Sequence, residues 1–313
     1  MVTGNNKFFT LSPVRVAELG LTKSDLLRLS PPGSRHLRGL SFSAAAWHDL
    51  GERGAATWLF RPTAKPSPAG RANIAAGDEA GVPNAYKCRV RQPWWQVPLV
   101  PPADLMLTYM NADTPRLSTN RAGVRHLNSV HGLYLCDEHR AVGRELLSLA
   151  SLNTLTLLGA ETVGRSYGGG MLKLEPREAD HLPVPAPALV ADNAAALTAV
   201  RPAVRDALAG GDLLGAVRMV DEVLLSRALG VTDEARECLV DAHARLTARR
   251  VARGAAATAQ TTSRRRHSAD DEPPPATSAA DTHSPPSAIS SSSARPSAPL
   301  NLGATDVPVG ART

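Results

Sequence analysis

The sequence has few cysteines and no spacing typical of a metal site. Its cysteines, Cys88, Cys136 and Cys238, lie far apart, and no C-x-x-C pair occurs. This pattern argues against a disulfide framework and against a zinc ribbon. His131, Cys136 and His139 have a loose ligand-like spacing, but no fourth ligand is evident. We therefore predict no metal site.

Aromatic residues and long apolar runs are also scarce. Every aromatic residue lies between Phe8 and Tyr167, so the second half must pack through Leu, Val and Ala, which favours helices. No apolar run approaches the roughly 18 residues of a membrane helix, and no signal peptide opens the chain. These absences predict a cytoplasmic protein with reduced thiols and no membrane partner.

No complete catalytic motif is present. The sequence contains no G-x-G-x-x-G, no H-E-x-x-H and no nucleophile elbow. The glycine run 168–170 is not followed by Gly-Lys-Ser/Thr and leads into an expected strand, unlike a P-loop. We therefore predict no catalytic residue on this chain.

Charge is the first positive indication. The net charge is +6, and residues 254–313 hold equal numbers of basic and acidic residues, so the surplus lies on residues 1–253. A basic folded part makes a polyanion a plausible partner, although many soluble domains carry a surplus of this size.

The pattern along the chain predicts an α+β protein in three parts. Residues 1–187 are expected to form a domain with a small mixed β-sheet and flanking helices, 188–253 a helical region, and 254–313 a disordered Ala/Ser/Pro-rich tail. Within the first part, Ser12 and Pro13 should open a short helix, and residues 21–33 a second one. The Pro- and Gly-rich stretch 62–84 is expected to be a loop. Strands are expected in four segments: 55–62, 104–110, 131–136 and 171–175.

The strongest local feature follows that loop. Residues 86–91 alternate apolar and basic types, which predicts a strand with Lys87, Arg89 and Arg91 on one face. Three cations on one face can neutralise DNA phosphates, and the neighbouring Trp94 and Trp95 can stack on a base. The alternative is a solvated strand face beside two core tryptophans.

Two further segments offer polar or flexible residues. Asn120 and Arg121 lie in a polar loop and have the side chains that pair with adenine and guanine, though loops are also polar for solubility alone. Tyr167 precedes Gly168–Gly170, a run that predicts a tight turn with close backbone approach. Lys173 is the one charge in the strand that follows.

Four blocks together resemble a known family. They are VTGNNKFF at 2–9, YKCRVRQPWWQVP at 86–98, LN at 127–128, and GRSYGGGMLKLEPREADHLPVP at 164–185. Their order and spacing resemble the C-terminal, target-recognising part of bacterial adenine-N6 DNA methyltransferases of the Eco57I-like and Taq-like kind, from restriction–modification systems. The resemblance covers roughly residues 2–190.

The resemblance implies a DNA target-recognition-like domain at 1–187 that binds double-stranded DNA. The family's enzymes carry two more motifs, a glycine-rich S-adenosylmethionine site and an Asn/Asp-Pro-Pro-Tyr/Phe loop, and neither occurs here. We therefore expect a detached or truncated recognition half that is inactive alone, with the cofactor on a missing or partner catalytic domain. The implied DNA-binding residues are Lys7, Lys87, Arg89, Arg91 and Lys173 at phosphates, Asn120 and Arg121 at bases, and Tyr167, Gly168 and Gly169 beside DNA or the connecting helices.

Three alternatives remain at this point. The chain is part of an intact methyltransferase whose start lies upstream, or a specificity subunit that works with a separate methylase. A specificity subunit usually has two recognition domains, and only one is evident. The third alternative is a non-catalytic interaction protein, which would show no salt-dependent binding to duplex DNA.

Overall fold

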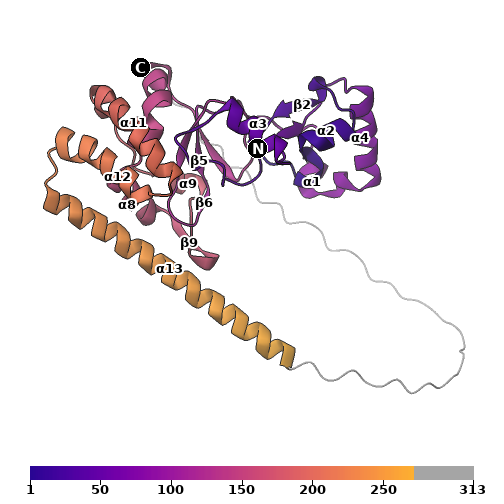
Figure 1. Ribbon diagram of the computed structural model, residues 1–313. Coiled ribbons are helices and arrows are strands. Elements are labelled where there is room, and N and C mark those ends of the chain that lie inside the picture. The colour runs from indigo at the N-terminus through magenta and orange to yellow at the C-terminus, as the bar shows by residue number, and fades with distance from the viewer. Residues whose placement is uncertain (271–313) are drawn as a thin grey trace, which may run out of the picture. The chain divides into compact units, whose positions relative to one another are not determined.

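The computed structural model describes residues 1–270, with side chains to Gly254. These residues form an α+β fold in which small sheets are flanked by helices, as predicted (Figure 1). Most of the predicted tail, 271–313, lies outside the described residues.

The described elements alternate short strands with helices along most of the chain. The strands are β1 (Thr10–Leu11), β2 (Leu26–Arg28), β3 (Ser41–Phe42), β4 (Trp58–Phe60), β5 (Leu105–Thr108), β6 (Met110–Asn111), β7 (Leu117–Asn120), β8 (Val130–Leu133), β9 (Arg165–Tyr167) and β10 (Met171–Lys173). The α-helices are α1 (Asn6–Phe9), α2 (Pro13–Glu18), α3 (Ala44–Glu52), α4 (Pro68–Glu79), α5 (Tyr86–Arg89), α6 (Asp137–Val142), α7 (Ser148–Ala150), α8 (Thr154–Val163), α9 (Pro176–Ala179), α10 (Pro187–Asp192), α11 (Ala194–Ala209), α12 (Leu213–Asp221) and α13 (Asp233–Asp270). Short 3-10 turns cover Lys23–Asp25, Val82–Asn84 and Gly168–Gly170, and π-helical segments cover Gly143–Leu147 and Glu222–Ala228.

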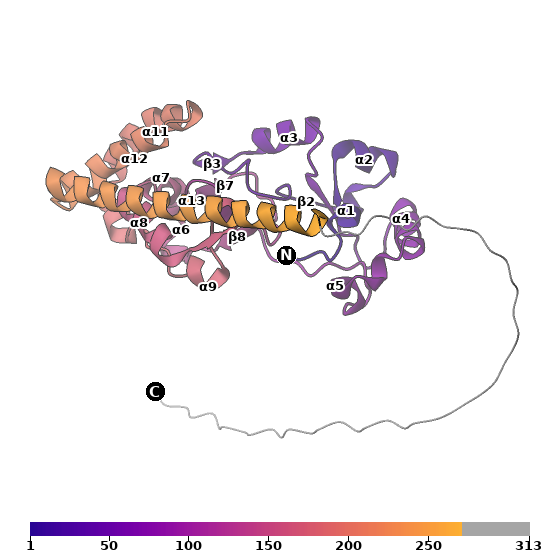
Figure 2. The same ribbon diagram turned by 90° about the horizontal axis from the view of Figure 1, so that it is seen from below.

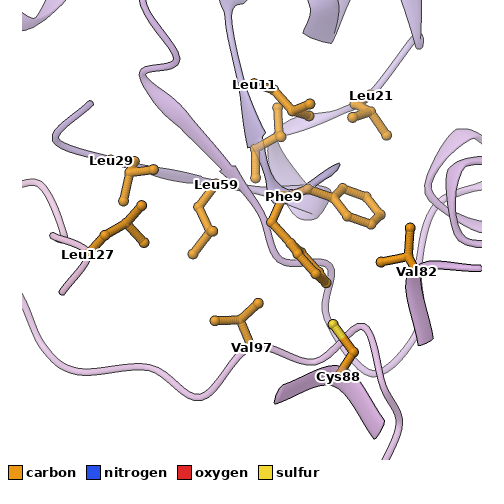
Figure 3. Packing of buried hydrophobic residues seen from close by; sticks show 11 residues of the cluster. Phe9, Leu11, Leu21, Leu29, Leu59, Val82, Cys88, Val97 and Leu127 are labelled. Atoms are coloured by element: carbon orange, nitrogen blue, oxygen red, sulfur yellow. The ribbon is translucent and has the colours of Figure 1, made fainter. Parts of the chain in front are cut away.

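The N-terminal part is built on a three-stranded antiparallel sheet in the order β1-β4-β2. Its core gathers around Phe9, and Cys88 of α5 turns its sulfur into the same cluster (Figure 3). Trp94 and Trp95 are half-buried against this cluster, which fits their interpretation as core residues. Burying so many large side chains is the main force that holds this part together.

Two local predictions in this part were wrong. Residues 21–33 form a 3-10 turn followed by strand β2, because Leu26 and Leu29 are needed in the core. The expected loop 62–84 contains helix α4, which begins with the side chain of Ser67 accepting a hydrogen bond from the Gly70 backbone N–H. Ser followed by Pro is a strong helix start, and here it outweighs the loop-like composition.

Asp25 joins these two segments. Its buried carboxylate accepts hydrogen bonds from the backbone N–H and hydroxyl of Ser67, at 3.1 and 2.6 Å, and from those of Thr22, at 3.1 and 2.9 Å. Burial by itself raises the pKa of Asp25, but these four bonds outweigh it and hold the pKa below its usual value. The negative charge therefore stabilises the fold.

A four-stranded sheet, β3-β7-β5-β8, forms the centre. Strand β5 is buried on both faces: Met106 packs into a cluster with Phe42, whereas Leu105 and Leu107 pack into another with Leu174. The predicted strands at 55–62, 104–110, 131–136 and 171–175 are all present as β4, β5 with β6, β8 and β10.

A separate hydrophobic cluster is formed by α7, α10, α11 and α12 together with the two π-helical segments. Val217, Val220 and Leu224 are buried on one stripe of this region. Asp221 lies on the buried side of the same helix and accepts hydrogen bonds from the N–H and hydroxyl of Thr154, at 2.8 and 2.5 Å. Here burial outweighs the hydrogen bonds and raises the pKa of Asp221.

A third sheet, β6-β10-β9, meets the long helix α13. Gly169 and Gly170 have positive φ angles of 72° and 76°, as a tight turn between β9 and β10 requires. A Cβ atom on Gly170 would lie 3.0 Å from the Cα of Val251 in α13. Close backbone approach was predicted for the glycine run, and its partner is this helix (Figures 1 and 2).

A buried ion pair fastens α13 to the sheets. The guanidinium of Arg250 contacts both carboxylate oxygens of Glu161 in α8, at 2.8–3.2 Å, and donates to the carbonyls of Gly170 and Asp113. Thr247 donates a further hydrogen bond to Glu161 at 2.9 Å. Helix α13 begins after Thr232, whose hydroxyl accepts a hydrogen bond from the Ala235 N–H, and continues past the predicted boundary at 253.

Within residues 1–270, no single helix has both the length and the apolar composition needed to cross a bilayer. The segments Asp137–Ala150 and Thr154–Val163, bent by 84° at the break between them, reach that composition only when taken together.

Candidate nucleic-acid interface

The predicted basic strand is a short helix. Residues 86–89 form α5, in which Cys88 is buried and Lys87 and Arg89 are exposed. The prediction of a strand with three cations on one face was wrong. Alternation over six residues is also compatible with one helical turn, and the burial of Cys88 in the core around Phe9 decided between them.

Arg91 points inward. Its guanidinium donates to the backbone carbonyls of Thr3 and Lys87 and lies 5.5 Å from the ring centre of Phe9. The carbonyl of Lys87 belongs to the last turn of α5, where carbonyls lack helical partners. Arg91 therefore links this helix end to the N-terminal segment, and we remove it from the candidate phosphate contacts.

Lys7, Lys87 and Arg89 remain exposed, and the segment before α1 lies against α5. Gly4, just before α1, lies against α5: a Cβ atom on Gly4 would be 3.0 Å from the Cβ of Lys87. Among the described side chains, none of the three cations has a hydrogen-bond or ion-pair partner. Tyr86, 63% exposed, stands beside Lys87 and Arg89, with its ring centre 5.2 and 6.0 Å from their cationic groups. We call Lys7, Tyr86, Lys87 and Arg89 the N-terminal basic patch.

A second group lies on the β9–β10 hairpin. Tyr167 is 54% exposed, and Gly168 and Gly169 have open space where a Cβ atom would be. The Nζ of Lys173 lies 5.0 Å from the ring centre of Tyr167 and 2.6 Å from Glu175. The hydrogen bond to Glu175 raises the pKa of Lys173, so the lysine stays charged, but that charge is already paired.

The two residues predicted to contact bases, Asn120 and Arg121, differ in their exposure to solvent. Asn120 is 1% exposed, and its amide donates to the carbonyls of Ala103 and Val124 while its oxygen accepts from the Val124 N–H. These bonds hold the turn after β7, so Asn120 is not available to read a base. Arg121 is exposed and pairs with Glu145 at 2.5 Å.

Of the three residues with ligand-like spacing, His131 lies apart from Cys136 and His139. His131 bonds to the carbonyl of Leu174 at 2.8 Å through Nε2. Cys136 and His139 lie at the start of α6 with Glu138, and their donor atoms are within 4.8 Å of one another. This set offers three ligands at the surface, and we assign no metal to it.

One basic pocket was not anticipated from the sequence. It has a volume of about 350 Å³ and lies between α8, the β9–β10 hairpin and α13. Arg249 and Arg253 line it together with Ser166 and Thr162. Arg249 and Arg253 are four residues apart, so they lie on one face of α13. The sequence did not predict this arrangement, because the helical region was expected to end at residue 253.

Comparisons with known proteins agree with the four sequence blocks. The family model of the type II methyltransferase M.Eco57I C-terminal domain matches residues 1–225. The type II methyltransferase M.XamI of Xanthomonas campestris pv. amaranthicola is 36% identical over 105 residues, which cover 34% of this chain and 19% of that protein. The matched chain thus spans less than a fifth of that relative's length. No solved structure matches this chain.

Proposed function

The chain belongs to the family of type II methyltransferase M.Eco57I C-terminal domains, and from this premise we propose that it binds duplex DNA as a target-recognition module. The module would serve an adenine-N6 methyltransferase of a restriction–modification system in the cytoplasm. The observation that carries the proposal is the N-terminal basic patch, whose three cations have no hydrogen-bond or ion-pair partner among the described side chains. Cations left free on a surface can replace the counterions of DNA phosphates.

The patch combines two kinds of contact. Lys7, Lys87 and Arg89 would contact phosphates, and Tyr86 offers an exposed ring for a sugar or base. On the hairpin, Tyr167 has a similar exposed ring beside two unobstructed glycines. Phosphate contacts would fix the register of the duplex, while side chains such as Arg121 would exchange their internal pairs for base edges.

Methyl transfer itself would come from a catalytic domain outside these 313 residues. That domain, upstream on the same polypeptide or in a separate subunit, would bind S-adenosylmethionine and the extruded adenine. Extruding a base costs a few kcal/mol. By gripping the flanking duplex, the recognition module would help to meet that cost.

Fluorescence anisotropy with a labelled duplex at several salt concentrations tests the proposal. The full chain should bind with a salt-dependent affinity, and Lys87→Ala with Arg89→Ala should lower the slope of log K against log salt by about 2, near 0.9 for each lost contact. A matched control, Arg205→Ala with Arg218→Ala, removes two exposed arginines from the helical part. Equal slopes for the patch variant and the control would refute the assignment of the patch.

A second measurement addresses catalysis. Incubated with duplex DNA and labelled S-adenosylmethionine, the chain should transfer no methyl group above background. Transfer by this chain alone would contradict the proposal that another domain supplies the chemistry. A methylase subunit recovered with the chain would favour a two-subunit arrangement.

A further inference from the structure

Helix α13 lies beyond the family match, which ends at residue 225, yet it is firmly attached to the matched domain. Arg250 is 4% exposed and Glu161 2% exposed at the side chain, and each is satisfied by the other. Gly170 lets the helix backbone approach the hairpin directly. The helix is therefore held at a defined position beside the β9–β10 hairpin, as Figure 1 shows for β9.

Arg249 and Arg253 lie on either side of Arg250 in α13, and no contact with a described side chain gives them a structural role. Arg249 and Arg253 are exposed, and neither has a hydrogen-bond or ion-pair partner among the side chains described up to residue 254. Both line the pocket of about 350 Å³ at the hairpin. Ser166 of β9 lines it as well, with its hydroxyl free of any partner in the same part of the chain.

The charge of the pocket is positive. Glu161 is the acidic residue among those that line it, and Arg250 already neutralises that carboxylate. Among the side chains described up to residue 254, Arg249 and Arg253 then leave two positive charges without an acidic partner. Their planar guanidinium groups match the geometry of phosphate oxygens, and a serine hydroxyl can donate a further hydrogen bond.

We propose that this pocket binds a phosphate of the DNA backbone, so that α13 extends the DNA interface beyond the family domain. This inference rests on the proposed function. Because α13 meets the hairpin at Gly170, the pocket adjoins the turn formed by Gly168–Gly170. Ser166 and Leu172 line the pocket from one face of the hairpin, and Tyr167 lies on the opposite face. A duplex backbone that runs past this turn would bring a phosphate between Arg249 and Arg253.

The experiment compares duplex binding by three variants of the full chain with binding by the unmodified chain at several salt concentrations. In Arg249→Gln with Arg253→Gln, the affinity should fall about 10- to 30-fold at 0.15 M salt, and the salt slope should fall by about 2. The charge-preserving pair Arg249→Lys with Arg253→Lys should keep the slope. The control Arg205→Gln with Arg218→Gln should resemble the unmodified chain.

The outcomes separate the two proposals. If the unmodified chain does not bind duplex DNA, the proposed function fails. If it binds and the glutamine variant binds equally well with the same slope, only the pocket assignment is overturned. Sub-millimolar binding of inorganic phosphate, combined with unchanged duplex affinity, would also overturn it and indicate a small-anion site. Circular dichroism checks that α13 stays helical in each variant.

Discussion

Breaking the pair between Arg250 and Glu161 should release α13 while the sheets stay folded. Leaving one buried charge without its partner costs about 3–5 kcal/mol. The carbonyls of Gly170 and Asp113 also lose their donor, at about 0.5–1.5 kcal/mol each. Arg250→Met should therefore weaken the docking of α13 by about 4–8 kcal/mol, because both costs act at the same contact.

Amide hydrogen exchange measures this loss locally. A change of about 4 kcal/mol is roughly a 10³-fold change in an opening equilibrium. Protection of residues 243–254 should fall by that factor or down to the level of a free helix. Amides of β5, in the central sheet, should keep their protection and serve as the internal control.

The double variant Glu161→Leu with Arg250→Met identifies the cause. It leaves no charge buried, so the larger cost disappears and only the cost of the two carbonyls remains. Protection should recover by more than half of the lost free energy. Single-variant protection within about threefold of the unmodified chain, or a double variant no better than the single one, would refute the reasoning.

Three further outcomes are expected in denaturation experiments. Gly170→Ala and Gly169→Ala should each cost about 1–2 kcal/mol, because both positions have a positive φ. Only Gly170→Ala also displaces α13, so it should lower the melting temperature more. Equal effects of the two variants would contradict the close approach of α13 to Gly170. Asp221→Asn should stabilise the chain at pH 7, because the raised pKa means that the ionised form opposes folding, and the gain should vanish as the pH falls through the folded pKa. Asp25→Asn should behave in the opposite way: its pKa is lowered, so its cost is largest at pH 7 and should shrink as the pH falls through the folded pKa. Urea titrations between pH 3 and 8 measure the difference in free energy of unfolding between each aspartate variant and the unmodified chain. A difference that does not change with pH would contradict both expectations.

The strands and several helices were predictable because their signals are local. Strand β5 is a run of buried apolar residues, and α2 follows Ser12 and Pro13 as the cap rules require. The prediction of a strand at 86–91 was wrong because so short an alternation of apolar and basic residues fits a strand and a helical turn equally well. Helix α4 was missed because its Pro, Gly and Ala content resembles a loop, although Ser67 marks its start.

The residues of the candidate site were also predictable only in part. Lys87 and Arg89 are exposed, as a run of cations between apolar residues indicates. Asn120 and Arg91 have suitable chemistry for DNA, yet the fold uses both internally. A side chain's chemistry is visible in the sequence, but its availability depends on which groups surround it.

The sequence by itself determined the family, through four ordered blocks, and the fold class, through the periods of its apolar residues. Only the tertiary structure decided that Gly170 faces helix α13 and that Arg91 serves the core. It also decided that Arg249 and Arg253, beside an Arg250 paired with Glu161, have no hydrogen-bond or ion-pair partner among the side chains described to residue 254. The physical reason is distance along the chain. Arg250 and Glu161 are 89 residues apart, so the pairing that makes one arginine structural and its neighbours available arises only when the chain folds.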